Sequence, residues 1–134
     1  MLNRLTDTLN FQGQALVLRS ERQRLLASNI ANADTPGYQA RDVNFAQALR
    51  EATGSAATTG TLSAPQAGHI AAATGARAEP NLLYATASQT NLDRNNVDMD
   101  RERAAFADNS VKYEATLRFI NGNVRTMLDA IKGQ

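Results

Sequence analysis

The sequence contains no cysteine and no tryptophan, and its 134 residues include one histidine, four phenylalanines and three tyrosines. Without cysteine the chain forms no disulfide bond and no thiolate metal site, so its fold does not depend on the redox state of its compartment. Large side chains dominate the burial of apolar surface, and the 43% apolar content leans heavily on alanine. The chain has length for one domain, and we expect its core to be thin.

An excess of charge of one sign is also lacking, because the formal net charge is +1. Such a balance gives no field that would indicate nucleic acid or an anionic membrane as a partner. Arg19, Arg22 and Arg24 are interrupted by Glu21, and we interpret them as a solvated helix face, so a DNA-binding helix is the most distant alternative. No apolar run suits a membrane span or the core of a secretory signal peptide. Either the protein is cytoplasmic or it is exported by a route without a cleaved signal.

No catalytic constellation is recognisable in the sequence. The single histidine, His69, has no companion ligands or nucleophile, and no glycine-rich phosphate loop or metal-ligand spacing occurs. Asp98, Asp100 and Glu102 alternate at a helix start, where acidic residues suit capping and the helix dipole. We therefore expect no enzyme, no cofactor, no metal site and no small-molecule substrate, with His69 exposed in a loop.

What the sequence does contain is helical periodicity at both ends. In the N-terminal stretch apolar residues recur every 3.5 residues, although Gln12, Arg19 and Gln23 occupy three positions of this ladder. Leu18 and Leu25 widen the apolar stripe. We predict an amphipathic helix near 2–33 that packs through its apolar ladder, which consists of Leu2, Leu5, Leu9, Leu16, Leu26 and Ile30.

A proline turn ends this helix. Pro36 lacks an N–H and disfavours helical geometry at Thr35, and Pro36-Gly37 suits the two central positions of a type II turn. Gly37 then requires a positive φ. Asn29 and Asn32 share one helix face, where their amides can cap exposed backbone groups. We predict a rigid corner between an inner helical layer and an outer excursion, formed by Asn29, Asn32, Thr35, Pro36, Gly37 and Tyr38.

Residues 34–96 form the expected connection between the two ends. Residues 38–41 should be extended, and Asp42 or Asn44 can cap a short helix that ends by Gly54. In residues 51–80, 23 of 30 positions are Ala, Gly, Thr, Ser or Pro, a composition that buries too little apolar surface to order by itself. Residues 79–84 follow as a candidate extended piece.

A second helix is predicted near 97–131. Asn95 and Asn96 are turn residues, Val97 follows, and Asp98 is a good N-cap. Acid precedes base by four residues in Asp108–Lys112 and Glu114–Arg118, and we expect Gly122 to allow a close helix approach. The apolar ladder of this helix consists of Phe106, Tyr113, Leu117, Ile120, Val124, Met127 and Ile131.

The predicted fold class is all-α. The two long helices should pack antiparallel as a coiled-coil-like hairpin, with an extended or partly disordered excursion between them. Residues 1–33 and 97–134 would then form one structural domain from both termini, and 34–96 would hold the corner, the short helix and the excursion.

Two stretches carry a resemblance to a known family. Ala31-Asn32-Ala33-Asp34-Thr35-Pro36-Gly37-Tyr38 resembles the Ala-Asn-x-x-Thr-Pro-Gly-Tyr signature of the bacterial flagellar axial proteins, the rod and hook family. The stretch that begins Asn95-Asn96-Val97-Asp98 is similar to the C-terminal segment of its proximal rod members. The resemblance covers roughly residues 1–50 and 82–134. It departs at Arg94, where the family often has glycine, and this puts the turn geometry before Asn95 in doubt.

The resemblance implies a structural subunit of the proximal rod of the flagellar basal body, a coiled-coil protein that folds on assembly into a tubular drive-shaft for motility. It further implies type III export without a cleaved signal peptide and a place in the periplasm. The implied partners are copies of the chain, other rod proteins, the rod–ring adaptor FliE, the ring protein FliF and the export apparatus. Two alternatives remain: another rod protein of the same family, or a monomeric helical-hairpin adaptor.

Overall fold

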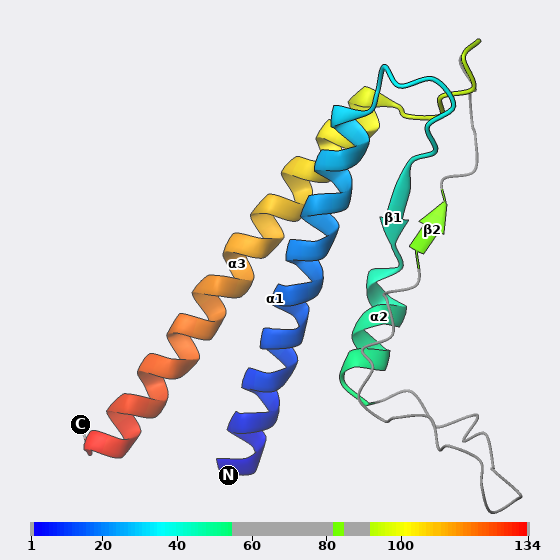
Figure 1. Cartoon of the computed structure of the whole chain (residues 1–134). Coiled ribbons are helices and arrows are strands. Elements are labelled where there is room, and N and C mark those ends of the chain that lie inside the picture. The colour runs from blue at the N-terminus through cyan, green and yellow to red at the C-terminus, as the bar shows by residue number, and fades with distance from the viewer. Residues whose placement is uncertain (1, 55–81, 85–91, 134) are drawn as a thin grey trace, which may run out of the picture.

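The computed structural model describes residues 2–54, 82–84 and 92–133. Along the chain the elements are α1 (Leu2–Ala31), β1 (Arg41–Val43), α2 (Phe45–Ala52), β2 (Leu82–Tyr84) and α3 (Met99–Lys132) (Figure 1). Most of the low-complexity stretch 51–80, His69 included, lies outside the described residues, so the expectations for it are not addressed.

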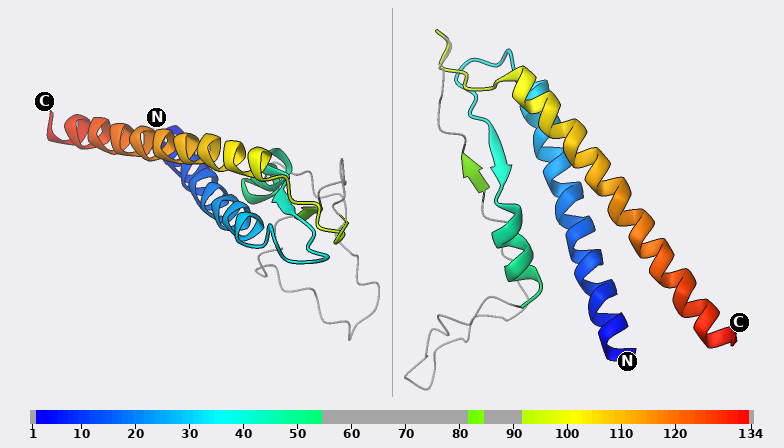
Figure 2. Two further views of the ribbon diagram at one scale, coloured as in Figure 1. Left: turned by 90° about the horizontal axis from the view of Figure 1, so that it is seen from above. Right: turned by 180° about the vertical axis from the view of Figure 1, so that it is seen from behind.

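The two long helices α1 and α3 lie side by side and run antiparallel, so that both termini are at the same end of the molecule (Figures 1 and 2). The predicted all-α hairpin is therefore confirmed, and the predicted helix ends near 2–33 and 97–131 are close to those observed. The two helices are closest where α1 ends and α3 begins, and they diverge toward the termini, as Figure 1 and the view from behind in Figure 2 show.

Local signals in the sequence account for the helix boundaries. Asp98 is the N-cap of α3, and its side chain accepts hydrogen bonds from the backbone N–H groups of Asp100 and Arg101 at 3.1 and 3.2 Å. At the other end Gly133 has a φ of 72° and donates its N–H to the carbonyl of Asp129. The cap predicted at Asp98 is confirmed.

The short elements form a strand–helix–strand unit beside α1. Strands β1 and β2 pair antiparallel, with Arg41 opposite Tyr84 and Val43 opposite Leu82. Between them along the chain, α2 is capped by Asn44, whose Oδ1 accepts from the N–H of Gln47 at 3.2 Å. Of the two caps proposed from the sequence, Asn44 is the one observed, and the extended piece expected within 79–84 forms β2.

The apolar core lies between α1 and this unit. Its buried residues are Leu18, Val43 and Ala48, and Leu25, Phe45, Leu49 and Leu82 pack against them. Leu18 and Leu25 were expected to widen the stripe that faces the second long helix, and this expectation is wrong. Both residues instead pack against β1 and α2. They can do so because α1 packs on α3 along one side and on β1 and α2 along another.

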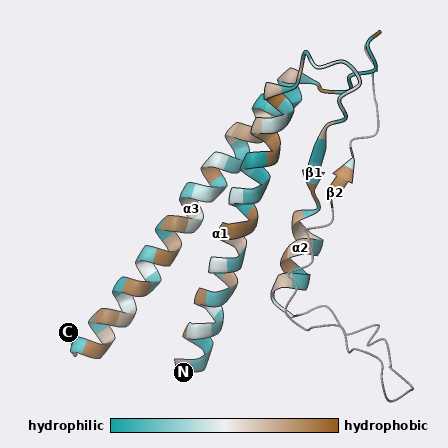
Figure 3. Ribbon diagram, viewed as in Figure 1, coloured by the Kyte–Doolittle hydropathy of each residue, from teal (hydrophilic) through white to brown (hydrophobic). Residues whose placement is uncertain are grey.

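The expectation for Gly122 is also wrong. A Cβ added at Gly122 would meet nothing within 4 Å, and the residue is exposed on α3. Gly122 therefore does not allow a close approach between helices within this chain. Apolar residues recur along α3 as far as its C-terminal end (Figure 3), and several of them are exposed.

Candidate functional site

The proline corner begins where α1 ends. The N–H of Tyr38 donates to the carbonyl of Thr35 at 3.2 Å, which closes a turn with Pro36 and Gly37 at its central positions. Gly37 has a φ of 72°, as a type II turn requires at its third residue. Thr35, Pro36 and Gly37 are exposed, so this turn lies on the surface of the chain.

Asn29 is the buried centre of the corner, with 1% of its surface exposed. Its Nδ2 donates to the carbonyl of Arg41 at 2.8 Å and to Oε2 of Glu102 at 3.0 Å. Its Oδ1 accepts from the N–H of Arg41 at 3.1 Å and from the hydroxyl of Tyr38 at 3.2 Å. One amide thereby joins α1, β1 and α3, with all of its hydrogen-bonding groups satisfied.

Asn32 has a more local role. Its Nδ2 donates to the carbonyl of Ser28 at 2.8 Å, and its Oδ1 accepts from the hydroxyl of Thr35 at 3.1 Å. Asn32 is only partly buried, and both partners lie within four residues of it. These bonds secure the last turn of α1 and leave the contact with distant segments to other side chains.

The most concentrated contact across the corner comes from Asn95, which is fully buried. Its Nδ2 lies 2.9 Å from the carbonyl oxygen of Asn32 and 2.8 Å from those of Ala33 and Thr35. Its Oδ1 accepts from the N–H of Val97 at 2.8 Å. The side chain therefore satisfies carbonyls that the end of α1 leaves without helical partners.

Arg94, immediately before Asn95, has a φ of 61° and is the one non-glycine residue with a positive φ in the described segments. The sequence placed the turn geometry in doubt here, because the resembling family often has glycine. The backbone does adopt the left-handed conformation that glycine accepts without strain. Arg94 thus bears the strain of this left-handed conformation.

Asn96, Val97 and Asp98 lead from the corner into α3. The N–H of Asn96 donates to the carbonyl of Tyr38 at 3.3 Å, and its Oδ1 accepts from the N–H of Ala40 at 2.7 Å. Val97 is buried and Asp98 caps α3. The two stretches that carry the family resemblance therefore meet in space and bond to each other directly.

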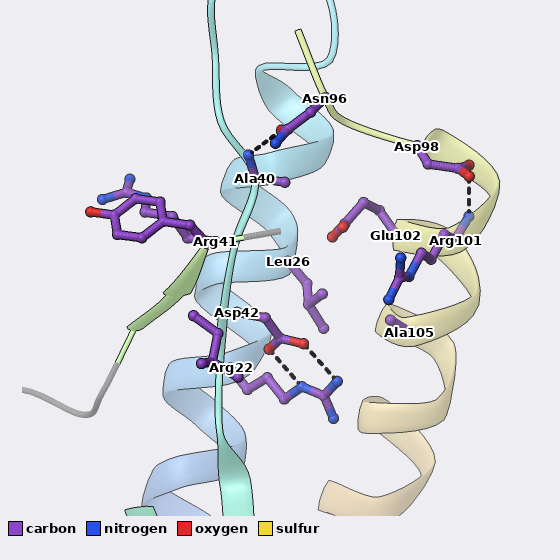
Figure 4. A pocket seen from close by; sticks show the side chains of 12 residues that line it. Arg22, Leu26, Ala40, Arg41, Asp42, Asn96, Asp98, Arg101, Glu102 and Ala105 are labelled. Carbon is purple, nitrogen blue, oxygen red and sulfur yellow. Dashed lines mark hydrogen bonds and ion pairs between the residues drawn. The ribbon is translucent and has the colours of Figure 1, made fainter. Parts of the chain in front are cut away.

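A pocket of about 310 Å³ lies beside this corner, between α1, the two strands and the start of α3 (Figure 4). At one side of it Arg22 binds both carboxylate oxygens of Asp42, with its Nε and one terminal nitrogen each at 2.9 Å. This hydrogen bond raises the pKa of Arg22. Glu102 faces the same pocket and is held by Asn29. Within the pocket, Asp42 is therefore paired with Arg22, and Glu102 accepts a hydrogen bond from the Asn29 amide.

The interpretation of the arginines as a solvated face is wrong for two of the three. Arg22 fastens β1 to α1 through Asp42, and the Arg19 guanidinium lies 4.4 Å from the centroid of the Phe45 ring. Burial lowers the pKa of Arg19, and the nearby charge of Arg22 contributes to this shift. Arg24 is exposed, as expected.

The burial of the predicted apolar ladder residues is uneven along α1 and α3. Leu26 is buried, whereas Leu5, Val124 and Ile131 are exposed near the diverging ends, and the side chain of Leu2 lies outside the described ones. The remaining ladder residues are partly buried; they are Leu9, Leu16, Ile30, Phe106, Tyr113, Leu117, Ile120 and Met127.

Sequence reasoning missed the polar contacts of the seam. Asn109 is fully buried, and its Nδ2 donates to the carbonyl of Arg19 at 2.9 Å and to Oε1 of Gln23 at 2.6 Å. Nε2 of Gln23 donates to the hydroxyl of Ser110 at 2.7 Å. The signal was present in the ladder, where Gln23 and Ser110 replace apolar residues, because polar residues in facing ladders can pair.

Across residues 2–54, 82–84 and 92–133 no group of three or more histidine or acidic side chains is placed to hold a metal ion. Within the same segments, no helix has both the length and the apolar character needed to cross a bilayer.

Comparison with known proteins gives a consistent result. The family described as "Flagella basal body rod protein" matches residues 9–39. The chain is 48% identical to the flagellar basal body rod protein FlgB of Proteus mirabilis (strain HI4320), over 98% of each chain. It is 48% identical to FlgB of Salmonella typhimurium over 99% of each chain, and 45% identical to FlgB of Escherichia coli (strain K12) over 98% of each.

Proposed function

The chain belongs to the FlgB family of flagellar basal body rod proteins, and from this premise we propose that it forms the proximal part of the rod and folds fully only on assembly. It is a structural protein of the flagellar basal body rod. We further propose that residues 1–33 and 97–134 make its rod domain, and that the protein catalyses no reaction.

The observation that carries this proposal is the corner, where Asn29 and Asn95 bond the end of α1 to β1 and to the start of α3. An assembling subunit needs its two long helices held in one relative orientation, since every copy must present the same surfaces. Buried amides whose groups are satisfied supply such a fixed geometry. We therefore propose that Asn29, Asn32, Thr35, Pro36, Gly37 and Tyr38, with Asn95–Asp98, act as the assembly corner.

Coupled folding is supported by the distribution of apolar surface. The core contains few large side chains, while Leu5, Val124 and Ile131 of the ladders are exposed in the single chain. Backbone ordering costs about 1–2 kcal/mol per residue, and a seam that is partly open offsets little of it. Contacts with other subunits would cover these residues and supply the missing stabilisation.

The partners follow from the same assignment. As a rod protein the chain assembles with other flagellar components. We propose that these are copies of itself, other rod proteins, the rod–ring adaptor FliE and the ring protein FliF. We place the assembled subunit in the periplasm, and we propose that the flagellar type III apparatus exports it without cleaving a signal peptide. Mass measurement of the chain from purified basal bodies tests the last point, since cleavage would shorten it.

The remaining alternatives differ in what the chain does alone. A helical-hairpin adaptor would be a stable, highly helical monomer, which circular dichroism with size-exclusion chromatography would reveal. Another position within the rod would leave the fold unchanged, and imaging of the basal body would separate it from the proximal position.

The deciding experiment is complementation of a strain that lacks the chain. We expect that strain to build no rod and no flagellum, and the native chain to restore both. Asn29→Leu should fail to restore swimming while the variant is still secreted, because it leaves Arg41 and Glu102 without their buried partner. A strain complemented with Asn121→Leu, a matched change at an exposed position of α3, should swim normally. Complete basal bodies in the strain without the chain would contradict the proposal.

A further inference from the structure

Polar side chains link α1 to α3 at two places along the seam below the corner. At the first, Asn109 bonds to the backbone of Arg19 and to Gln23, and Gln23 bonds in turn to Ser110. At the second, Nδ2 of Asn123 donates to Oε1 of Gln12 at 3.0 Å. The hydroxyl of Ser110 also donates to the carbonyl of Phe106 at 2.9 Å, so the first cluster is anchored to the backbone of both helices.

Two large apolar residues of α3 lie on the side of the helix away from the seam, beside charged residues such as Asp108. Val111 is 68% exposed and Phe119 is 66% exposed. At about 100° per residue, Val111 lies roughly opposite Asn109 around the helix. Phe119 lies about a quarter turn from Val111. Ala115 and Gly122 fall between these two positions around the helix. The observed face carries more large apolar residues and is favoured by burial, but burial is not directional and does not by itself fix the exact rotation of α3 against α1.

We propose that the amide cluster of Gln23, Asn109 and Ser110 is a facing lock, which fixes the rotation of α3 against α1 below the corner. Rotation of α3 would remove the bonds of Asn109 to Arg19 and Gln23 and leave buried polar groups without partners. The observed rotation is therefore selected, and Val111 and Phe119 remain on the outside. This selection acts within one chain, whether or not that chain assembles into a rod.

The cost of the cluster supports a role in specificity. Oδ1 of Asn109 is buried and has no hydrogen-bond partner in the described part of the chain. A buried polar group without a partner lowers stability, and apolar residues of similar volume at such positions are often neutral or stabilising. A single buried asparagine is known to fix helix register in coiled coils at the expense of stability.

The test uses the full chain, which lacks cysteine, in trimethylamine N-oxide, an osmolyte that favours the folded state. One reporter carries Gln12→Cys with Asn123→Cys, across the observed seam. The other carries Gln12→Cys with Gly122→Cys, at the same height on the outer side of α3. A short bifunctional thiol reagent joins each pair. We expect the first reporter to crosslink roughly tenfold better than the second, the preference that two amide hydrogen bonds of ordinary net strength would give.

Removal of the lock by Gln23→Leu with Asn109→Leu should bring the two crosslinking yields to within about twofold of each other, while helicity by circular dichroism is kept or raised. The matched control, Gln14→Leu with Asn121→Leu, changes exposed residues of the same types and should keep the tenfold preference. The lock would be refuted by equal yields in the native background, or by an undiminished preference after its removal. Loss of helicity in the double variant would assign the cluster to stability and would equally overturn the proposal.

Discussion

At the scale of single residues, the corner depends on side-chain amides that replace backbone partners. Asn29 contacts both the N–H and the carbonyl of Arg41, as a neighbouring strand would, and Asn95 binds three carbonyls at the end of α1. Each amide offers both donors and an acceptor in one plane, so it can satisfy backbone groups that no regular element reaches. An apolar residue of equal size at position 29 would remove these bonds to Arg41, and one at position 95 would remove the bond to the carbonyl of Ala33.

The backbone at Gly37 provides the first prediction. A Cβ added at Gly37 meets nothing within 4 Å, so the cost of Gly37→Val is backbone strain and not a steric clash with another residue. At a φ of 72° this strain is about 1–2 kcal/mol, and it is greater for a β-branched residue. We expect Gly37→Val to shift osmolyte-induced folding, followed by circular dichroism, to higher osmolyte concentration. Gly37→Asn should change this osmolyte concentration little, since asparagine tolerates the left-handed conformation. Equal shifts for valine and asparagine would contradict the explanation by backbone strain.

Arg94 gives a prediction of opposite sign. Because its φ is 61°, Arg94→Gly should relieve strain and stabilise the folded chain by about 1 kcal/mol. The same folding transition should then move to lower osmolyte concentration. Arg94→Ala removes the charge and keeps the strain, so it should not reproduce the gain. If alanine stabilises as much as glycine, the side chain and not the backbone is responsible.

At the scale of elements, the two strands show how three-residue segments persist. One edge of β1 pairs with β2, and on the other side Asn29 and Asn96 bond to Arg41 and Ala40. Beneath them Leu18 packs with Val43 and Ala48, and the Arg22–Asp42 pair adds a charged contact. A two-stranded ribbon this short is marginal in water, so its stability comes from docking on α1.

That dependence predicts the effect of shortening one side chain on α1. Leu18→Ala removes buried apolar contacts and should cost about 2–4 kcal/mol, with α2 and β1 released before the seam between α1 and α3. Val17→Ala, next to it but exposed, should cost less than about 1 kcal/mol. Hydrogen exchange under folding osmolyte conditions can follow each element separately. Equal loss of protection in α2 and in the C-terminal part of α3 would argue against the view that α1 packs on these two elements along separate sides.

At the scale of the whole molecule, a long hairpin is supported by a small core. The fully buried apolar residues are few, and the exposed apolar residues include Ile131 at 76% and others on both long helices. The fold is well defined at the corner, where the amides converge, and open toward the termini, where α1 and α3 diverge. Such a distribution suits a protein completed by its neighbours.

We accordingly predict that the isolated chain in dilute buffer is largely unfolded and becomes helical in the rod. The seam and the core bury too little surface to offset the ordering of two long helices. Native-state hydrogen exchange on the purified chain should show rapid exchange throughout α1 and α3. Slow exchange along both ladders would contradict this prediction and favour a hairpin that is stable by itself.

The sequence alone determined the features that depend on local chemistry. Periodic apolar residues placed both long helices, Asp98 marked the cap of α3, and Pro36-Gly37 marked the turn, because propensity and capping act over a few neighbouring residues. For the short helix the sequence offered two caps, Asp42 or Asn44, and the structure has Asn44. The signature residues also indicated the family.

Only the tertiary structure decided which distant residues meet. Leu18 and Leu25 turned toward β1, Arg19 and Arg22 found Phe45 and Asp42, and Asn109 was buried against Gln23. A helical pattern gives the faces of one helix but not their partners, because each contact depends on the position of an element dozens of residues away. The same pattern of leucines fits a seam or a core, and the choice between them is made by packing.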